Sequence, residues 1–314
     1  MKILVTGGAG FIASHIVDDY VKAGHKVIVV DNLSTGFRKN LNPKAKFYKS
    51  DIRNFPEMEK IFKHEKPTMV NHHAAVSLVM SSIDNQILTY ETNLIGTVNL
   101  LLTFGEYGSG SAGYRKKFIF ASSGGTIYGQ PKKIPVHESI ALAPISPYGL
   151  SKFLGEETVK FYGKSFGFEY LIFRYPNVYG PRDISHVIPI FARLMKKGIK
   201  PTIFGDGSKA RDYTYIEDIA QANILGLKKG VNEILNLGWG KKITDKKVFD
   251  TIKKEISFVE KIKEKGPVDT PRYASYRKGE IYQIALDSGR ATKILGWKPK
   301  IKFEEGIGRT LETL

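Results

Sequence analysis

Short runs of β-branched and other apolar residues alternate with longer amphipathic stretches over the first half of the chain. In the longer stretches the apolar residues recur every three or four positions, which is typical of helices with one buried face. Strands that alternate with helices need parallel crossovers, so the pattern predicts an α/β fold with a doubly wound parallel sheet. The expected strands are residues 2–6, 26–31, 45–49, 68–72, 117–121 and 170–174, and the expected helices are 11–23, 56–64, 85–107 and 147–166.

The alternation becomes irregular after about residue 175, where prolines separate shorter elements. Neither an internal repeat nor a low-complexity linker divides the chain. We therefore expect a first domain of residues 1–175 built on the sheet. Residues 176–314 are expected to form a smaller α/β region that packs on the first domain and is partly interleaved with it.

Composition narrows the protein class. The 314 residues include no cysteine, so disulfides and thiolate chemistry are excluded, and a reducing cytoplasm is the expected location. We find no apolar run of the roughly 18 residues that a membrane span needs, and Met1 leads directly into a predicted strand rather than a secretory segment. We therefore expect a cytoplasmic protein without a membrane partner.

The charge is unusual, since 48 Lys and Arg against 31 Asp and Glu give +17. Such an excess makes nucleic acid a candidate partner, because neutralised phosphates dominate that kind of binding. The basic residues, however, are scattered pairs and triplets without a basic tail or a known nucleic-acid motif. Solvated lysines explain this arrangement better, so we expect no nucleic-acid partner; a charged small substrate remains compatible.

A glycine-rich turn follows the first predicted strand. Gly7 and Gly10 lie three residues apart, Ala13 follows three residues later, and a predicted helix begins in between. Such a turn lets backbone amides approach a pyrophosphate at the positive end of the helix. Asp31 ends the second strand 21 residues after Gly10, where a carboxylate would bind a ribose and repel a 2′-phosphate. The glycine turn and Asp31 together favour NAD over NADP, although either feature alone would also suit an ordinary turn.

Tyr148 and Lys152 form the candidate catalytic pair. Ser146 is a good N-cap and Pro147 a good first residue, so a helix should begin here and place Tyr148 and Lys152 on one face. A nearby ammonium and the positive end of the helix favour a phenolate, which can then act as a base. A tyrosine and a lysine four apart also occur by chance, and it is the upstream dinucleotide motif that favours the catalytic interpretation.

Hydroxyl groups follow the strand predicted at 117–121. Because ligands bind at the carboxyl edge of a parallel sheet, Ser123 or Thr126 could face the same pocket as Tyr148; an ordinary serine–glycine turn is the alternative. His72 and His73 end another strand at this edge. We interpret them as cofactor-wall or packing residues and expect no metal, because no further cluster has ligand spacing.

Together these residues resemble the extended short-chain dehydrogenase/reductase family, and within it the NAD-dependent nucleotide-sugar epimerases. The resemblance covers nearly the whole chain. Its most specific segments are residues 174–182 (RYPNVYGPR), 204–207 (FGDG) and 211–213 (RDY). Further matches are residues 6–12, 31–36, 51–53, 72–75, 93–97, 148–152 and 295–299, together with Arg277, Glu280 and Asp287.

The resemblance implies a Rossmann domain that binds NAD and a carboxy-terminal region that mainly binds the nucleotide sugar. Its implied cofactor residues are Gly7, Gly10, Phe11, Ile12, Asp31, Asn32, Ser34, Thr35, Gly36, Asp51, Ile52, His73, Ala74, Ala75, Asn93, Ser122, Tyr148, Lys152 and Tyr175. Its implied substrate residues are Ser123, Thr126, Tyr148, Asn177, Ile203, Phe204, Arg211, Arg277 and Glu280.

Individual roles also follow from the resemblance. Asn177 would bind the substrate diphosphate, while Arg211 and Arg277 would neutralise its charges. Glu280 would reach a ribose hydroxyl. Ile203 and Phe204 would flank the uracil, and Tyr175 would lie at the nicotinamide.

The implied reaction is reversible inversion at C4 of a UDP-hexose through a 4-keto sugar, with tightly bound NAD. Tyr148, Lys152 and Ser123 would be catalytic. The family usually has its catalytic hydroxyl at the position of Gly124; counting along the strand selects Ser123, with Thr126 in reserve. Dehydratases of the family carry acidic residues where this chain has Gly125 and Thr126, which disfavours dehydration.

Other interpretations of the sequence remain open. A nucleotide-sugar reductase or dehydratase of the same family is the nearest alternative, and a non-catalytic NAD-binding or basic nucleic-acid-binding protein is the alternative of another class. The sequence does not decide which hexose is accepted. The resemblance also implies a homodimer that forms through the helices predicted at 85–107 and 147–166.

Overall fold

The computed structural model describes residues 1–110, 113–259, 268–277 and 279–314. Its centre is a seven-stranded sheet in the order β11-β6-β5-β4-β1-β2-β3, and every neighbouring pair is parallel. The strands are β1 (Lys2–Thr6), β2 (Lys26–Asp31), β3 (Lys46–Lys49), β4 (Met69–His72), β5 (Lys117–Ser123), β6 (Glu169–Tyr175) and β11 (Glu233–Asn236). The predicted doubly wound α/β class is confirmed.

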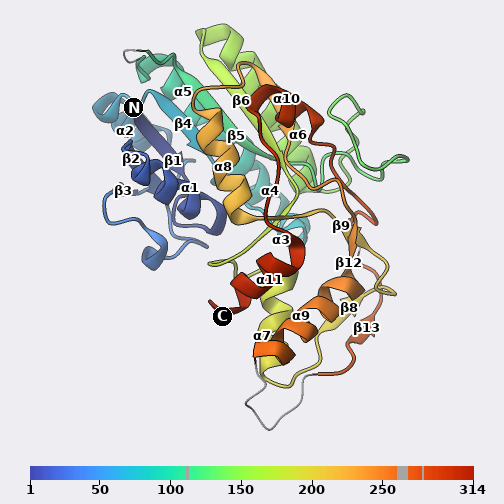
Figure 1. Cartoon of the computed structure of the whole chain (residues 1–314). Coiled ribbons are helices and arrows are strands. Elements are labelled where there is room, and N and C mark those ends of the chain that lie inside the picture. Colours follow the sequence, from blue (N-terminus) through green and yellow to red (C-terminus); the bar gives the residue numbers. More distant parts are fainter. Residues whose placement is uncertain (111–112, 260–267, 278) are drawn as a thin grey trace.

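Helices cover both faces of the sheet (Figure 1). One face packs on α1 (Phe11–Lys22) and α8 (Ile216–Gly226), and the other on α2 (Phe55–Glu65), α5 (Gly96–Tyr107) and α6 (Pro147–Phe166). Alternate strand residues supply the two cores: Ile3 and Val5 face the first, while Leu4 faces the second. Since helices cover both faces of the sheet, the strand sequences are nearly continuous runs of apolar residues.

The strand order reverses at β1, which lies between β4 and β2. Chain segments therefore leave β1 and β4 toward opposite faces, and a crevice opens beyond their carboxyl ends. This topology brings the ends of β1, β4, β5 and β6 to one edge. The candidate residues that follow these strands consequently lie on the same side of the molecule.

The helix beginnings follow the sequence signals. The Ser146 hydroxyl accepts the Gly149 N–H at 3.1 Å, and Pro147 opens α6. Asn54 caps α2 in the same way through Glu57 N–H. The α1 helix differs, since it begins after Gly10 without a side-chain cap, which leaves its first N–H groups free for a ligand.

The helix predicted at 85–107 is interrupted. The structure has α3 (Val79–Asp84), α4 (Gln86–Tyr90), a π-turn η2 (Glu91–Ile95) and then α5. Within the π-turn, the Asn93 amide accepts Val76 N–H at 2.8 Å and donates to Val76 O at 3.0 Å. These tertiary bonds, together with one to Ser151, accompany the widened turn, and no periodicity of apolar residues encodes them.

Beyond residue 175, the described residues form three two-stranded sheets: β7 (Asn177–Tyr179) with β10 (Tyr213–Tyr215), β9 (Ala210–Arg211) with β12 (Ile243–Thr244), and β8 (Thr202–Phe204) with β13 (Arg272–Ala274). The helices of this part, besides α8, are α7 (Val187–Lys196), α9 (Asp245–Val259), α10 (Gly289–Leu295) and α11 (Phe303–Leu311). A short 3-10 helix, η1 (Arg38–Asn40), lies in the first half.

This second half shares its core with the first. One apolar cluster contains Val17 of α1 and Ile219 of α8, and the Asn71 amide of β4 donates to Asn223 Oδ1 of α8 at 2.9 Å. Strand β11 also joins the main sheet beside β6. A division at residue 175 therefore stays a prediction. Among the described residues we find no helix long and apolar enough to cross a membrane.

Candidate active site

The glycine turn after β1 has the shape of a phosphate cradle. Gly7 has a φ of +71°, and a Cβ on it would lie 2.8 Å from the Ala74 nitrogen. A Cβ on Gly36 would lie 2.8 Å from the Ala9 Cβ, because the 32–37 loop folds over the turn. These positions therefore require glycine, and the uncapped N–H groups of Phe11 and Ile12 lie at the start of α1.

Two carboxylates lie at the ends of β2 and β3. Asp31 is buried and accepts Ala9 N–H at 3.0 Å and Leu33 N–H at 2.7 Å; burial raises its pKa. Asp51 accepts the Asn32 amide at 2.9 Å and is paired with Arg53, which lowers its pKa to about 2. A cavity of about 460 Å³, lined by Asp51, Arg53, Asn54, Glu91 and Ile95, lies beside this pair.

This arrangement fits a dinucleotide. Ile52 is buried against Gly96, where a Cβ would lie 2.6 Å from the Ile52 Cδ1. Ser34 and Thr35 are exposed in the adjoining loop, with Ser34 N–H bonded to the Asn32 side chain. The glycine turn, the Asp31 carboxylate and the pocket at Asp51 thus lie near one another at this edge of the sheet.

The wall between the two halves of this edge is formed by His73 and Tyr175. The rings are stacked with centroids 5.7 Å apart, and His73 Nε2 lies 3.1 Å from the Tyr175 hydroxyl. Burial, with Lys152 nearby, lowers the pKa of His73 to about 3, so the ring is neutral. The buried His73 Nδ1 has no hydrogen-bond partner in the described structure. Ala74 and Ala75 continue the half-buried wall.

Tyr148, Ser123 and Lys152 come together at the centre of the edge. Tyr148 lies in the first turn of α6, and the Ser123 hydroxyl at the end of β5 is near enough to act on its pKa. Lys152 Nζ lies 6.0 Å from the Tyr148 ring centroid and donates to Ala121 O at 2.8 Å. The triad that the sequence suggested is thus assembled around one point.

Burial dominates the protonation of this group. Burial raises the pKa of Tyr148 to about 12, and the Ser123 hydroxyl partly offsets this rise. Burial also lowers the pKa of Lys152 to about 7, and the Glu156 carboxylate partly offsets this fall. A positive charge on Lys152 would favour the phenolate form of Tyr148, which can accept a proton.

Other hydroxyl and amide side chains lie less directly at the site. The Ser122 hydroxyl points to Glu156, 2.5 Å away, because neighbouring residues of β5 face opposite sides. Asn93 uses both ends of its amide on Val76 and Ser151, so it positions the loop after β4. Thr126 Oγ1 is buried and without a hydrogen-bond partner in the described structure.

The second half of the site faces the triad across Gly125. A Cβ on Gly125 would lie 3.4 Å from the Asn177 Oδ1 and 3.9 Å from the Ser123 Oγ. Asn177 is fixed on β7 by donating its N–H to Asp212 O at 2.9 Å. Arg211, on β9, donates to the carbonyls of Ala210 and Tyr282, each at 3.1 Å.

Phe204, Arg277 and Glu280 form one cluster. The Arg277 guanidinium lies 3.5 Å from the Phe204 ring centroid, and Arg277 Nη1 lies 3.7 Å from a Glu280 carboxylate oxygen. Ile203 is buried behind Phe204. Sequence reasoning missed Lys209, a buried lysine whose Nζ lies 2.5 Å from the other Glu280 oxygen.

Two more residues were missed. Glu156 lies four residues after Lys152, so its place on the same helix face was available from spacing alone. Asn223, on α8, donates to the Tyr175 hydroxyl at 2.9 Å, a contact between distant segments that no motif signals. Among the described residues, no group of His, Asp and Glu is arranged to hold a metal ion.

The fold and the site define a dehydrogenase-type enzyme that binds a dinucleotide at a Rossmann sheet. The model of the NAD dependent epimerase/dehydratase family matches residues 3–238, and the chain belongs to that family. The resemblance seen in the sequence and the NAD cofactor are thereby confirmed.

Individual relatives are similar over their full length. A Methanocaldococcus jannaschii protein provisionally named UDP-glucose 4-epimerase is 45% identical over 314 residues, covering 98% of this chain and 97% of the other. The crystal structure of UDP-glucose 4-epimerase from Thermotoga maritima with UDP-glucose has a TM-score of 0.92 and 42% identity, covering 100% and 98% of the two chains. The Thermus thermophilus UDP-glucose 4-epimerase with NAD has a TM-score of 0.90 and 36% identity, with coverage of 100% and 98%.

Proposed function

We propose that this protein interconverts UDP-glucose and UDP-galactose by inverting the configuration at C4. The observation that carries the proposal is the grouping of Tyr148 with the Ser123 hydroxyl and with Lys152, one helical turn away, on the same sheet edge as the glycine cradle. Full-length relatives with this activity support the substrate class.

The residues divide the work as follows. Tyr148 removes the proton from O4, Ser123 holds the oxygen through its hydrogen bond, and Lys152 stabilises the phenolate. NAD, when bound, accepts hydride from C4 and returns it to the opposite face of the resulting 4-keto sugar. Tyr148 then gives the proton back to O4, so neither protons nor electrons are consumed overall.

The far end of the substrate is held while the sugar turns. In this proposal Asn177, Arg211 and Arg277 bind the diphosphate, while Phe204 flanks the uracil and Glu280 reaches a ribose hydroxyl; the clustering of Phe204, Arg277 and Glu280 supports these roles. Binding energy from these remote contacts retains the intermediate without fixing which face of the hexose meets the cofactor.

Position 125 favours epimerisation over dehydration. Because a side chain there would lie beside Asn177 and Ser123, an acidic residue at 125 would reach the sugar. The chain has glycine at this position, and Thr126 follows it. The group that would remove a C5 proton is therefore missing from the place where the site would hold it.

The test is to incubate the purified protein with UDP-galactose, without added cofactor, and to separate the products by chromatography. We expect UDP-glucose to accumulate to an equilibrium mixture and NAD to be released when the protein is denatured. A 6-deoxy-4-keto product in stoichiometric amounts, or no turnover of any UDP-hexose, would overturn the proposal.

We also propose a homodimer formed by α4, η2, α5 and α6. Large apolar side chains are exposed on these elements, among them Ile87 at 77%, Ile95 at 52% and Phe161 at 65%. The equivalent face of a second copy would cover them. Sedimentation should show a dimer and Ile87→Glu a monomer; a monomeric parent protein would contradict the assembly.

A further inference from the structure

A buried ion pair lies directly behind the catalytic lysine. The Arg174 guanidinium binds the Glu156 carboxylate through two bonds, Nε to Oε1 at 2.9 Å and Nη2 to Oε2 at 2.6 Å. The exposed fractions of the two side chains are 4% and 0%. The Ser122 hydroxyl donates a third bond to Oε1, so the carboxylate is held from two strands, β5 and β6.

Fold stability alone does not explain this pair. Desolvating two charges cancels much of their attraction, and an apolar pair of similar volume often stabilises a core at least as well. The location of the pair suggests another use, since Glu156 is one turn beyond Lys152 on the same helix.

Glu156 supplies the negative charge in the surroundings of Lys152. The groups that face the lysine are Tyr148 on α6, the neutral rings of His72 and His73 at the end of β4, and the Phe120 ring and Ala121 carbonyl on β5. Burial lowers the pKa of Lys152 to about 7 even with Glu156 present, and the carboxylate acts to raise it. Without that charge the ammonium would lose its proton more readily.

Arg174 keeps the carboxylate in place. Among the ion pairs of the described residues, Glu156 is paired with Arg174, while Lys152 Nζ binds the neutral Ala121 carbonyl. The ammonium charge is therefore not masked by a direct salt bridge and remains available to Tyr148.

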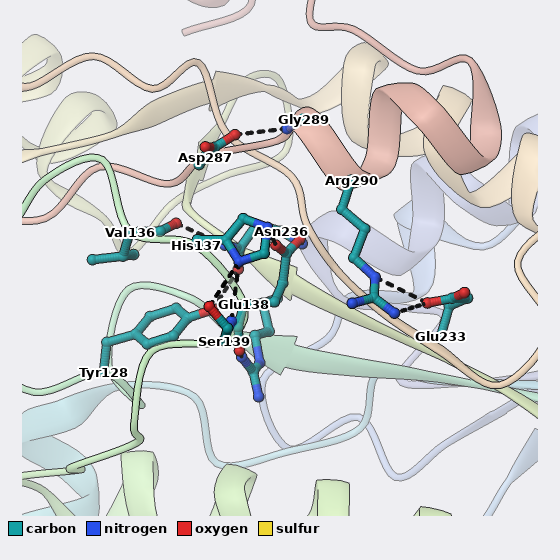
Figure 2. A network of polar contacts seen from close by, with 11 residues as sticks. Tyr128, Val136, His137, Glu138, Ser139, Glu233, Asn236, Asp287, Gly289 and Arg290 are labelled. Atoms are coloured by element: carbon teal, nitrogen blue, oxygen red, sulfur yellow. Dashed lines mark hydrogen bonds and ion pairs between the residues drawn. The ribbon is translucent and has the colours of Figure 1, made fainter.

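The same guanidinium fixes the turn that follows Ser123. Arg174 Nη1 donates to the Tyr128 hydroxyl at 2.8 Å, and Tyr128 donates to Asn236 Oδ1 at 2.8 Å. Figure 2 shows Tyr128 and Asn236 meeting beside Val136 and Glu138. The Asn236 N–H donates to the Glu138 carboxylate, and the Asn236 side-chain amide donates to Val136 O. One network thus connects the lysine helix, the serine strand and the loop between them.

We propose that Glu156, held by Arg174 and Ser122, is a positioning residue that keeps the Lys152 ammonium charged and directed at Tyr148. The inference rests on the proposed function, in which Tyr148 is the base. Whether the Glu156 carboxylate sets the charge of Lys152 can nevertheless be measured without turnover.

The experiment titrates Lys152 in the NAD-loaded protein labelled with ¹³C at the lysine Cε, with the Lys152 resonance assigned by its loss in Lys152→Met. In Glu156→Gln we expect the titration midpoint to fall by about one pH unit or more. Glu156→Asp should retain the parent midpoint because the charge remains. Glu157→Gln, which alters the next residue at an exposed position, should leave the midpoint unchanged.

An unchanged or higher midpoint in Glu156→Gln overturns the inference. If that variant does not fold because Arg174 is left unpaired, Glu156→Gln with Arg174→Gln removes both charges. Because Glu156, and not Arg174, is the charged group that acts on the pKa of Lys152, the midpoint should still fall, and no fall overturns the inference.

Turnover provides the second readout. In Glu156→Gln, kcat should decline on the alkaline side at lower pH than in the parent protein, with the KM for the UDP-sugar unchanged. If no variant and no parent protein turns over UDP-sugars but the midpoint falls as expected, the proposed function fails and the charge-setting role stands. A purely structural role would lower kcat equally at all pH values, which would contradict the inference.

Discussion

The guanidinium carbon of Arg277 lies 3.5 Å from the centroid of the Phe204 ring, while Arg277 Nη1 lies 3.7 Å from a Glu280 carboxylate oxygen. The ring is on β8, and the arginine follows β13, which pairs with β8 in parallel. The pairing of two three-residue strands therefore sets the direction of a cation that the proposed function assigns to the nucleotide.

Phe204→Leu should weaken nucleotide-sugar binding without slowing the chemistry. A cation on an aromatic ring contributes about 0.5–2 kcal/mol, so KM should rise about 2- to 30-fold with kcat nearly unchanged. Steady-state kinetics with UDP-galactose measure this. Phe55→Leu, at an exposed ring on α2, is the control, and an equal KM in both variants would show that the stack does not position Arg277.

Ser123→Ala and Thr126→Val distinguish the two candidate hydroxyls. The Ser123 hydroxyl acts on the pKa of Tyr148, whereas Thr126 Oγ1 is buried without a described partner. A hydrogen bond to a charged group contributes about 1.5–3 kcal/mol, so Ser123→Ala should lower kcat about 10- to 150-fold. Thr126→Val should change kcat by less than about threefold, because it removes no bond to Tyr148. The reverse order would assign the role to Thr126.

Tyr148→Phe should remove the base but keep the binding site. We expect kcat to fall at least about 100-fold, the usual contribution of a positioned acid or base. Retention of NAD after gel filtration and calorimetry with UDP would show that the fold is intact. Tyr162→Phe alters the same helix farther from its start and should keep full activity; comparable turnover in Tyr148→Phe would exclude this tyrosine as the base.

The burial of Lys152 should make stability depend on pH. Its pKa is lowered from 10.5 to about 7, so between these values the unfolded chain binds a proton that the folded protein lacks. The free energy of unfolding contributed by this group consequently rises with pH across the window, by at most about 1.4 kcal/mol per unit, and the full cost of burying the ammonium applies below pH 7.

Lys152→Met should therefore gain stability relative to the parent most strongly at pH 6.5, with the gain shrinking toward pH 10. Urea unfolding at several pH values measures the difference. Lys164→Met, at an exposed position on the same helix, should show no such trend. Parallel stability curves for Lys152→Met and the parent would contradict the burial argument.

Much of this protein was determined by its sequence alone. Alternating strand and helix patterns predicted the doubly wound sheet, because covered parallel strands are apolar throughout and helices repeat every three to four residues. The glycine turn before α1, Asp31, Tyr148 and Lys152 were found from local spacing. Each of these roles depends on residues that are near one another in the chain.

Only the tertiary structure decided what depends on distant segments. It widened the helix at Asn93 through bonds to Val76, and it joined β11 to the main sheet. It brought the Ser123 hydroxyl near Tyr148, paired Lys209 with Glu280, and placed Arg174 on Glu156 behind the lysine. A sequence pattern records which residues will be buried, but the partner of a buried charge is chosen by packing between segments that no spacing rule connects.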